Sequence, residues 1–336
     1  MRASVGIDIV NRRVRGAIIG AMVSSRAPAV SLAVVGSRLL LEQVVLGLTR
    51  DEGQRQAAIE AVVDAACAAA AGGHCTILTE VLSALSAVEG ADKTARVADS
   101  DLVSPLMHAV QGGHLPLVQT CLALRFDPNA KSSNRWTPLM YAAQFGCPSI
   151  CAALVKAGAE ANVEGGGGLS ALAVACQGGS DGCARVLLEA GASMQSKDGV
   201  GYTPLMHACK FGHVTVLKVL FEYMSGDDLN EKDNWNATPL IHAVEQNQIE
   251  AVVALLTADE IARGVERCRV NEVLVSKKNP TDRKTALDVC LGEGEENKGG
   301  KGEQLAMQAC LERFGGKTIE ELEGGKEHAD TKADAL

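Results

Sequence analysis

Two stretches of the sequence carry residue types that could do chemistry. Residues 315–318, Gly-Gly-Lys-Thr, end like a phosphate-binding loop, in which backbone N–H groups and a lysine hold phosphates. That loop requires a glycine five residues before Gly316, where this sequence has Leu311, and no strand precedes it. Cys147 and Cys151 lie one helical turn apart, but no nearby cluster completes the four ligands of a zinc site. Neither stretch therefore predicts a ligand site.

The remaining reactive residues show no catalytic arrangement in the sequence. We find no Ser/His/Asp constellation, and Cys176 and Cys209 occupy equivalent places where a small residue packs between helices. We therefore expect a protein that is not an enzyme and that has no catalytic residues, no cofactor and no metal. An enzyme whose catalytic residues meet only in space stays open as an alternative.

Three of the seven histidines belong to a motif that recurs along the chain. The sequence Thr-Pro-Leu-Met-His-Ala begins at Thr203. Related sequences begin at intervals of 33 residues before it, and one begins 35 residues after it: Ser104, Thr137, Ser170 and Thr238. Self-similarity at a fixed period of this size is typical of a repeat array.

Each unit has the pattern of two short helices joined by a turn. The hydroxyl of Thr203 can cap a helix, and Pro204 suits the first helical position, because its missing N–H leaves no hydrogen bond unmade. Gly212 can end this helix in a left-handed conformation. A second helix with apolar side chains at helical spacing follows, and neither helix can bury its apolar stripe unless neighbouring units stack.

The Thr-Pro-Leu-x-His-Ala motif at period 33 resembles the ankyrin-repeat family. The resemblance implies an all-α solenoid of helix-turn-helix repeats with short β-hairpin-like loops and degenerate terminal repeats. It also implies a non-catalytic adaptor or scaffold that binds partner proteins on its concave face. The histidines four residues after the cap (His108, His207 and His242) would then tie the cap to a loop. A structural subunit of a larger assembly is the alternative function.

The chain divides by composition and period into five segments. We expect a basic N-terminal segment, a degenerate capping repeat, five ankyrin repeats, an insertion with a split sixth repeat, and an acidic disordered tail, at residues 1–50, 51–98, 99–257, 258–316 and 317–336. A helical turn is expected in the insertion. The third repeat has four glycines at 165–168, so its loop should be the softest joint of the array.

Charge and cysteine content narrow the class of partner and the compartment. The net charge of −9 argues against nucleic acid, and the apolar region from Ala17 to Leu48 is interrupted by Arg26 and Arg38, so no membrane span is expected. Eleven cysteines without paired spacing indicate reduced thiols and a cytoplasmic protein. Residues 1–50 contain seven arginines and two acids, which fits either an organellar transit peptide or an amphipathic helical cap.

Aromatic residues predict where a protein partner would bind. Five of the ten aromatics fall where the family pattern directs side chains toward the groove: Trp136, Phe145, Tyr202, Phe211 and Trp235. Interfaces are enriched in such side chains, although aromatics before Thr-Pro could instead pack the loops. Neighbouring positions would supply the rim of the site: Asn134, Gln144, Val200, Lys210, Asn234 and Gln246.

Overall fold

The computed structural model describes the chain at residues 66–67, 69–74, 78–79, 102–224, 228–258, 274–275, 283–286, 290 and 301–318. The chain separates into two compact units, residues 1–160 and 161–336, and each is described by itself. Several sequence predictions fall outside the described residues: those for the basic N-terminal segment, for most of the degenerate capping repeat, for residues 259–263 of the insertion and for nearly all of the acidic tail.

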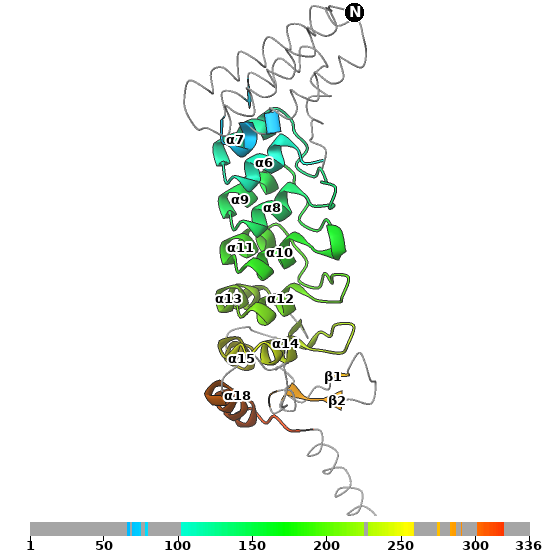
Figure 1. The fold of residues 1–336 in the computed structure, drawn as a ribbon, viewed down its shortest axis with the longest axis vertical. Coiled ribbons are helices and arrows are strands. Elements are labelled where there is room, and N and C mark those ends of the chain that lie inside the picture. The colour runs from blue at the N-terminus through cyan, green and yellow to red at the C-terminus, as the bar shows by residue number, and fades with distance from the viewer. Residues whose placement is uncertain are drawn as a thin grey trace, which may run out of the picture. The chain divides into compact units, whose positions relative to one another are not determined.

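The first unit contains two complete helix pairs (Figure 1). Their bounds are α6 (Pro105–Gln111), α7 (Leu115–Ala123), α8 (Pro138–Gln144) and α9 (Pro148–Lys156). The first helices of the pairs, α6 and α8, pack against each other, and so do the second helices, α7 and α9. Leu106, Leu117, Leu139 and Leu154 are fully or almost fully buried between them. The apolar stripes of neighbouring units thus bury each other, as the pattern predicts.

The described part of the second unit has the same construction, with three complete helix pairs. The pairs are α10 (Ala171–Gly178) with α11 (Asp181–Glu189), α12 (Pro204–Phe211) with α13 (Val214–Tyr223), and α14 (Pro239–Glu245) with α15 (Ile249–Leu256). Figure 1 shows α10, α12 and α14 in one row and α11, α13 and α15 in a second row. Two short 3₁₀ turns lie between pairs, η1 (Gly166–Gly168) and η2 (Asp228–Asn230).

Most first helices begin at the capping residue that the sequence predicts. Ser104, Thr137, Ser170 and Thr203 each accept a hydrogen bond from the backbone N–H three residues later. The prediction is wrong for Thr238, whose hydroxyl is buried and makes no hydrogen bond to any described residue. Thr238 still has the extended backbone of a cap, and its carbonyl accepts the first helical hydrogen bond, from His242 N at 3.2 Å.

The core of the repeats is made of small and branched apolar side chains. Leu205 and Ala208 of α12 are buried, and so are Val216, Leu217 and Leu220 of α13, as their spacing predicts. Gly212 ends α12 in the left-handed conformation, at φ 71°. Cys176 and Cys209 are completely buried in equivalent places. Burial raises the pKa of the Cys176 thiol, which therefore stays protonated and fills space as an apolar group does.

An amide side chain bridges successive repeats at one recurring position. In the first unit, Asn129 Nδ2 donates to the carbonyl of Gly158 at 3.1 Å, and Glu160 N donates to Asn129 Oδ1 at 2.8 Å. In the second unit, Asn162 makes the same two bonds, to Gly191 O at 3.0 Å and from Ser193 N at 2.8 Å. Each asparagine thereby fixes the turn that follows the next second helix.

The amide bridge changes where two residues are inserted before the fifth repeat. Gln195 stands 33 residues after Asn162, but its Nε2 donates to the Asp228 carboxylate at 3.2 Å rather than to a backbone carbonyl. The turn after α11 has a left-handed glycine, Gly191, whereas Met224 after α13 is extended. The insertion therefore removes the backbone turn that the amide would otherwise reach.

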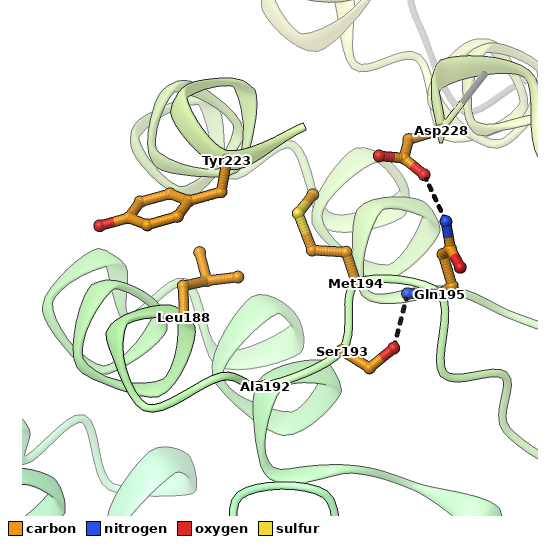
Figure 2. Close-up of a pocket in the computed structure, with 7 residues that line it drawn as sticks. All are labelled: Leu188, Ala192, Ser193, Met194, Gln195, Tyr223 and Asp228. Carbon is orange, nitrogen blue, oxygen red and sulfur yellow. Dashed lines mark hydrogen bonds between the residues drawn. The ribbon is translucent and has the colours of Figure 1, made fainter. Parts of the chain in front are cut away.

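A pocket of about 290 Å³ lies beside this altered turn (Figure 2). Leu188 and Tyr223 line it from α11 and α13, and Met194 comes from the loop between α11 and α12. The Gln195–Asp228 hydrogen bond lies at the other side of the pocket.

The C-terminal part of the second unit departs from the simple repeat. Strands β1 (Leu274–Val275) and β2 (Arg283–Lys284) pair antiparallel, so the described part of the insertion includes a short strand. Thr285 donates through its hydroxyl to the carbonyl of Lys317 at 2.7 Å. Ala286 and Cys290 are helical and buried, as expected for the start of a sixth repeat.

Helix α18 (Lys301–Arg313) takes the place of the second helix of that repeat and packs on α15. The helix begins at Lys301 and includes Gly302. Met307 and Leu311 are buried, four residues apart on one face. Leu305 is 66% exposed, because positions 305 and 307 lie about 200° apart on a helix and therefore face opposite sides.

Candidate partner-binding surface

The loop before each first helix is closed by one residue that caps its own turn. In the fourth repeat, Asp198 Oδ1 accepts hydrogen bonds from the backbone N–H groups of Val200 and Tyr202, at 3.0 and 2.8 Å. The backbone of Asp198 completes the hairpin, since its N–H donates to Tyr202 O and its carbonyl accepts from Gly201 N. We call the loop before each first helix, here residues 198–202, the finger loop of its repeat. This finger loop is therefore held by its own hydrogen bonds before any partner binds.

The same closure recurs in the other finger loops with different side chains. Asp233 Oδ1 accepts from Trp235 N and Ala237 N in the fifth repeat. Ser132 Oγ accepts from Trp136 N in the second repeat. Gly165 makes only the backbone bonds in the third repeat, because it has no side chain to accept. The third finger loop thus has fewer internal bonds than the fourth and fifth.

A left-handed residue directs the chain from the loop tip back toward the helix. Arg135, Gly201 and Asn236 occupy equivalent positions and all have positive φ. At Gly201 a side chain is also excluded by space, because a Cβ would lie 2.7 Å from Asn234 Oδ1. This turn places the next residue, which is Trp136 or Tyr202 in two of the repeats, directly before the helix cap.

A histidine on each of two first helices locks its own finger loop. His207 Nε2 donates to Asp198 Oδ2 at 3.1 Å, and His242 Nε2 donates to Asp233 Oδ2 at 3.0 Å. In the second repeat the helix has Tyr141 instead, and its hydroxyl donates to Ser132 Oγ at 3.4 Å. The role in tying the loop that the family resemblance implies is therefore present at His207 and His242.

The pKa values of the two histidines are shifted in opposite directions by burial and by neighbouring charges. Burial lowers the pKa of His207, and this effect outweighs the opposing Asp198 and is increased by Lys210. Burial also favours neutral His242, but the hydrogen bonds that His242 donates to Asp233 and Glu245 raise its pKa above the ordinary 6.5. Glu245 Oε2 lies 3.5 Å from His242 Nδ1, whereas His207 Nδ1 has no hydrogen-bond partner among the described residues.

Tyr202 is the centre of an aromatic cluster in the second unit. Its ring centroid lies 4.6 Å from that of His242 and 6.3 Å from that of Trp235, which meets it edge to face. Lys210 Nζ lies over the Tyr202 ring, 5.0 Å from its centroid. Burial and the nearby carboxylates raise the pKa of Tyr202 to about 12, so the phenol stays neutral and can donate a hydrogen bond. We call Tyr202, Lys210, Trp235, His242 and Glu245 the Tyr202 cluster.

The other predicted site residues of the second unit lie on the surface near this cluster in sequence. Val200 is 41% exposed at the loop tip, and Phe211 is 42% exposed at the end of α12, where its ring stacks on that of His213. Asn234 is exposed and Gln246 is half-buried. These residues are accessible to a partner.

The predicted site residues of the first unit form a smaller group. The rings of Trp136 and Tyr141 are tilted against each other, with centroids 5.3 Å apart. Asn134 and Gln144 are exposed, and Phe145 is 51% exposed at the end of α8. Trp136 thus packs on its own repeat, while Phe145 presents apolar surface to solvent.

Sequence reasoning missed two parts of the site. Glu245 was not among the candidate residues, although it occupies in its repeat the position that Lys210 has in the preceding one. The histidines indicated a contact between loop and helix, but their carboxylate partners, Asp198 and Asp233, were not identified. The spacing of nine residues from Asp198 to His207, and again from Asp233 to His242, was the signal that could have identified the partner carboxylates.

The described residues offer no second kind of site. Within that part of the chain, no three His, Cys, Asp or Glu side chains are grouped so as to hold a metal ion. Cys147 and Cys151, the pair considered for zinc, lie at the start of α9, where Cys151 is fully buried. Of the described helices, none combines the length and apolar character needed to cross a membrane.

Comparison with known proteins identifies the repeats independently of the geometry. A family model described as ankyrin repeats (3 copies) matches three overlapping stretches, residues 65–165, 106–198 and 172–264. Together they span residues 65 to 264, more than half of the 336-residue chain. No curated protein matches the chain. With helix pairs stacked at a 33-residue period and a family model that matches most of them, the chain belongs to the ankyrin-repeat family.

Proposed function

We propose that this protein is a non-catalytic adaptor that binds a partner protein on its finger loops and first helices. Ankyrin repeats are generally protein–protein interaction modules. The observation that supports this surface is the Tyr202 cluster, where two aromatic rings, a lysine and a carboxylate are held together beside a closed loop. Tyrosine and tryptophan are enriched among the residues that contribute most to binding.

The rigidity of the loops supports the same surface. The side chains of Asp198 and Asp233 fix the two finger loops beside the cluster through backbone N–H groups and through His207 and His242. A partner therefore meets a surface that is ordered in advance, and association avoids part of the entropy that ordering a flexible loop would require. The second helices carry no comparable group of aromatic side chains in the described part of the second unit.

The experiment compares two aromatic variants with a matched control. Partners are first collected in cells by proximity labelling of the full chain, and one direct partner is purified. We expect Tyr202→Ala and Trp235→Ala each to weaken its binding about tenfold or more, as is typical when a large aromatic contact is removed. Tyr223→Ala is the control, because Tyr223 is 38% exposed on the second helix α13. Circular dichroism and thermal melting check that all three variants remain folded.

Equal binding by wild type and both cluster variants would reject this surface. Weakening by Tyr223→Ala alone would move the interface to the second helices. Phe145→Ala and Trp136→Ala test in the same assay whether the first unit also contacts the partner. Recovery of the chain only as an inseparable component of a large complex, in native-size chromatography, would instead favour the structural-subunit alternative.

A further inference from the structure

The face of the Tyr202 ring already carries a positive charge from within the protein. Lys210 Nζ lies 5.0 Å from the ring centroid. A cation at this distance over an aromatic face is attracted by the negative charge of the π system. Lys210 is only half-buried, and its side chain is long and flexible, so it can leave the ring at small energetic cost.

The charges around this ring are unbalanced. Three carboxylates surround Tyr202 (Asp198, Asp233 and Glu245), and together they contribute to its raised pKa. Within the Tyr202 cluster, Lys210 is the lysine that lies over the ring these carboxylates surround. His207 and His242 are already hydrogen-bonded to Asp198 and Asp233. The side chain of Glu245 is 32% exposed, so its negative charge can be reached from solvent.

We infer that the Tyr202 cluster accepts a cationic side chain, arginine or lysine, of the partner protein, which takes the place of Lys210 on the Tyr202 ring. Trp235 supplies a second aromatic wall, edge-on to Tyr202, and Glu245 supplies the countercharge. Lys210 acts as an internal substitute that occupies the ring until the partner binds. This inference rests on the proposed function and assigns the chemistry of one contact within it.

The charge of the surrounding sequence agrees with a cationic ligand. From residue 161 to residue 258 the chain has five lysines and arginines and eleven acidic residues. A partner with a basic segment would be drawn to this part of the chain, and the attraction would weaken as salt is added.

Removal of Lys210 gives opposite results for the two possible charges of a ligand. The probes are two capped tripeptides, acetyl-Gly-Arg-Gly-amide and acetyl-Gly-Glu-Gly-amide, added to the full chain. Binding is followed by NMR at the indole N–H of Trp235, which is readily assigned because the chain has two tryptophans and Trp136→Phe removes the other signal. In Lys210→Met the competing cation is gone, so the arginine peptide should bind about two- to fivefold more tightly.

A matched pair of carboxylate variants tests the countercharge. Glu245→Gln should weaken the arginine peptide by up to about fivefold, while Glu250→Gln, on the exposed side of α15, should leave it unchanged. The inference would be overturned if the wild type bound the glutamate peptide more tightly than the arginine peptide. It would also be overturned if Lys210→Met bound the arginine peptide more weakly than the wild type does. The lack of a saturable shift with the arginine peptide would overturn it as well. If Tyr202→Ala still abolishes capture of the protein partner in that case, the proposed function stands and only the charge assignment fails.

Discussion

At the scale of single residues, His207 and His242 show how burial and neighbouring charges together set the pKa of a histidine. Both lie at the same place in successive repeats, and both donate to an aspartate nine residues earlier. Three residues after each histidine stands a different charge, Lys210 in one repeat and Glu245 in the next. The lysine lowers the pKa of its histidine and the glutamate raises that of the other.

Titration by NMR should therefore show His207 below and His242 above the ordinary pKa of 6.5. Because the fold lowers the pKa of His207, its contribution to stability is present above pH 6.5 and is lost as the pH falls through the lowered pKa. The contribution of His242 is present below pH 6.5 and is lost as the pH rises through the raised pKa.

Exchange of the neighbouring charges provides the control for this prediction. Lys210→Glu should raise the pKa of His207, because the new carboxylate can reach the unpartnered Nδ1, and Glu245→Lys should lower that of His242. Shifts in the opposite sense in either variant would show that the neighbour three residues on does not set the titration.

At the scale of structural elements, the finger loops depend on one acceptor each. The carboxylate of Asp198 accepts from two backbone N–H groups and from His207. Without this carboxylate, His207 would have no hydrogen bond from either ring nitrogen to a described residue. A buried polar group that loses its partner destabilises a fold more than the net value of the bond suggests.

We expect Asp198→Ala to lower the free energy of unfolding by about 1.5–3 kcal/mol, the range for hydrogen bonds to charged groups. Asp198→Asn should lower it by less, because the amide oxygen can still accept from the backbone of the loop. Urea unfolding measures both values. Equal losses in the two variants would show that the charge, and not the acceptor for the loop amides, stabilises this element.

The sequence predicts these elements well where a residue acts on the backbone within a few positions of itself, as a helix cap or a glycine turn does. The caps at Ser104, Thr137, Ser170 and Thr203 and the turn at Gly212 follow from hydroxyl and glycine chemistry that acts within a few residues. The Tyr202 cluster could be foreseen only in part. It brings together a loop, the end of α12 and the face of α14, so the contacts of Tyr202 with Trp235 and His242 depend on how two repeats stack.

At the scale of the whole molecule, each described helix pair packs mainly against the pairs next to it within its unit. α12 lies between α10 and α14, while α18 packs on α15 at the other end of the second unit. Stability in such a stack is approximately the sum of the repeats and of the interfaces between neighbours. A change in a central repeat should therefore affect more of the chain than the same change at the end.

Leu205→Ala in α12 and Leu311→Ala in α18 test this difference. Both side chains are buried, at 2% and 0% exposure, and each substitution should lower the free energy of unfolding by about 2–5 kcal/mol through a cavity. Hydrogen exchange should become faster in α10 and α14 as well as α12 for Leu205→Ala, but mainly in α15 and α18 for Leu311→Ala. Faster exchange over the same residues in both variants would indicate one cooperative unit instead of nearest-neighbour coupling.

The two residues inserted before the fifth repeat have a consequence for how this array can change in length. Duplication or loss of a 33-residue segment keeps the contacts between repeats intact where an asparagine bonds to the glycine turn of the next repeat, as Asn162 does to Gly191. A crossover that joined the fourth repeat to a 33-residue neighbour would leave Gln195 facing a glycine turn, without the Asp228 carboxylate that it now binds. Units on the two sides of this junction are therefore not interchangeable modules, and a splice made for engineering has to carry Gln195 and Asp228 together.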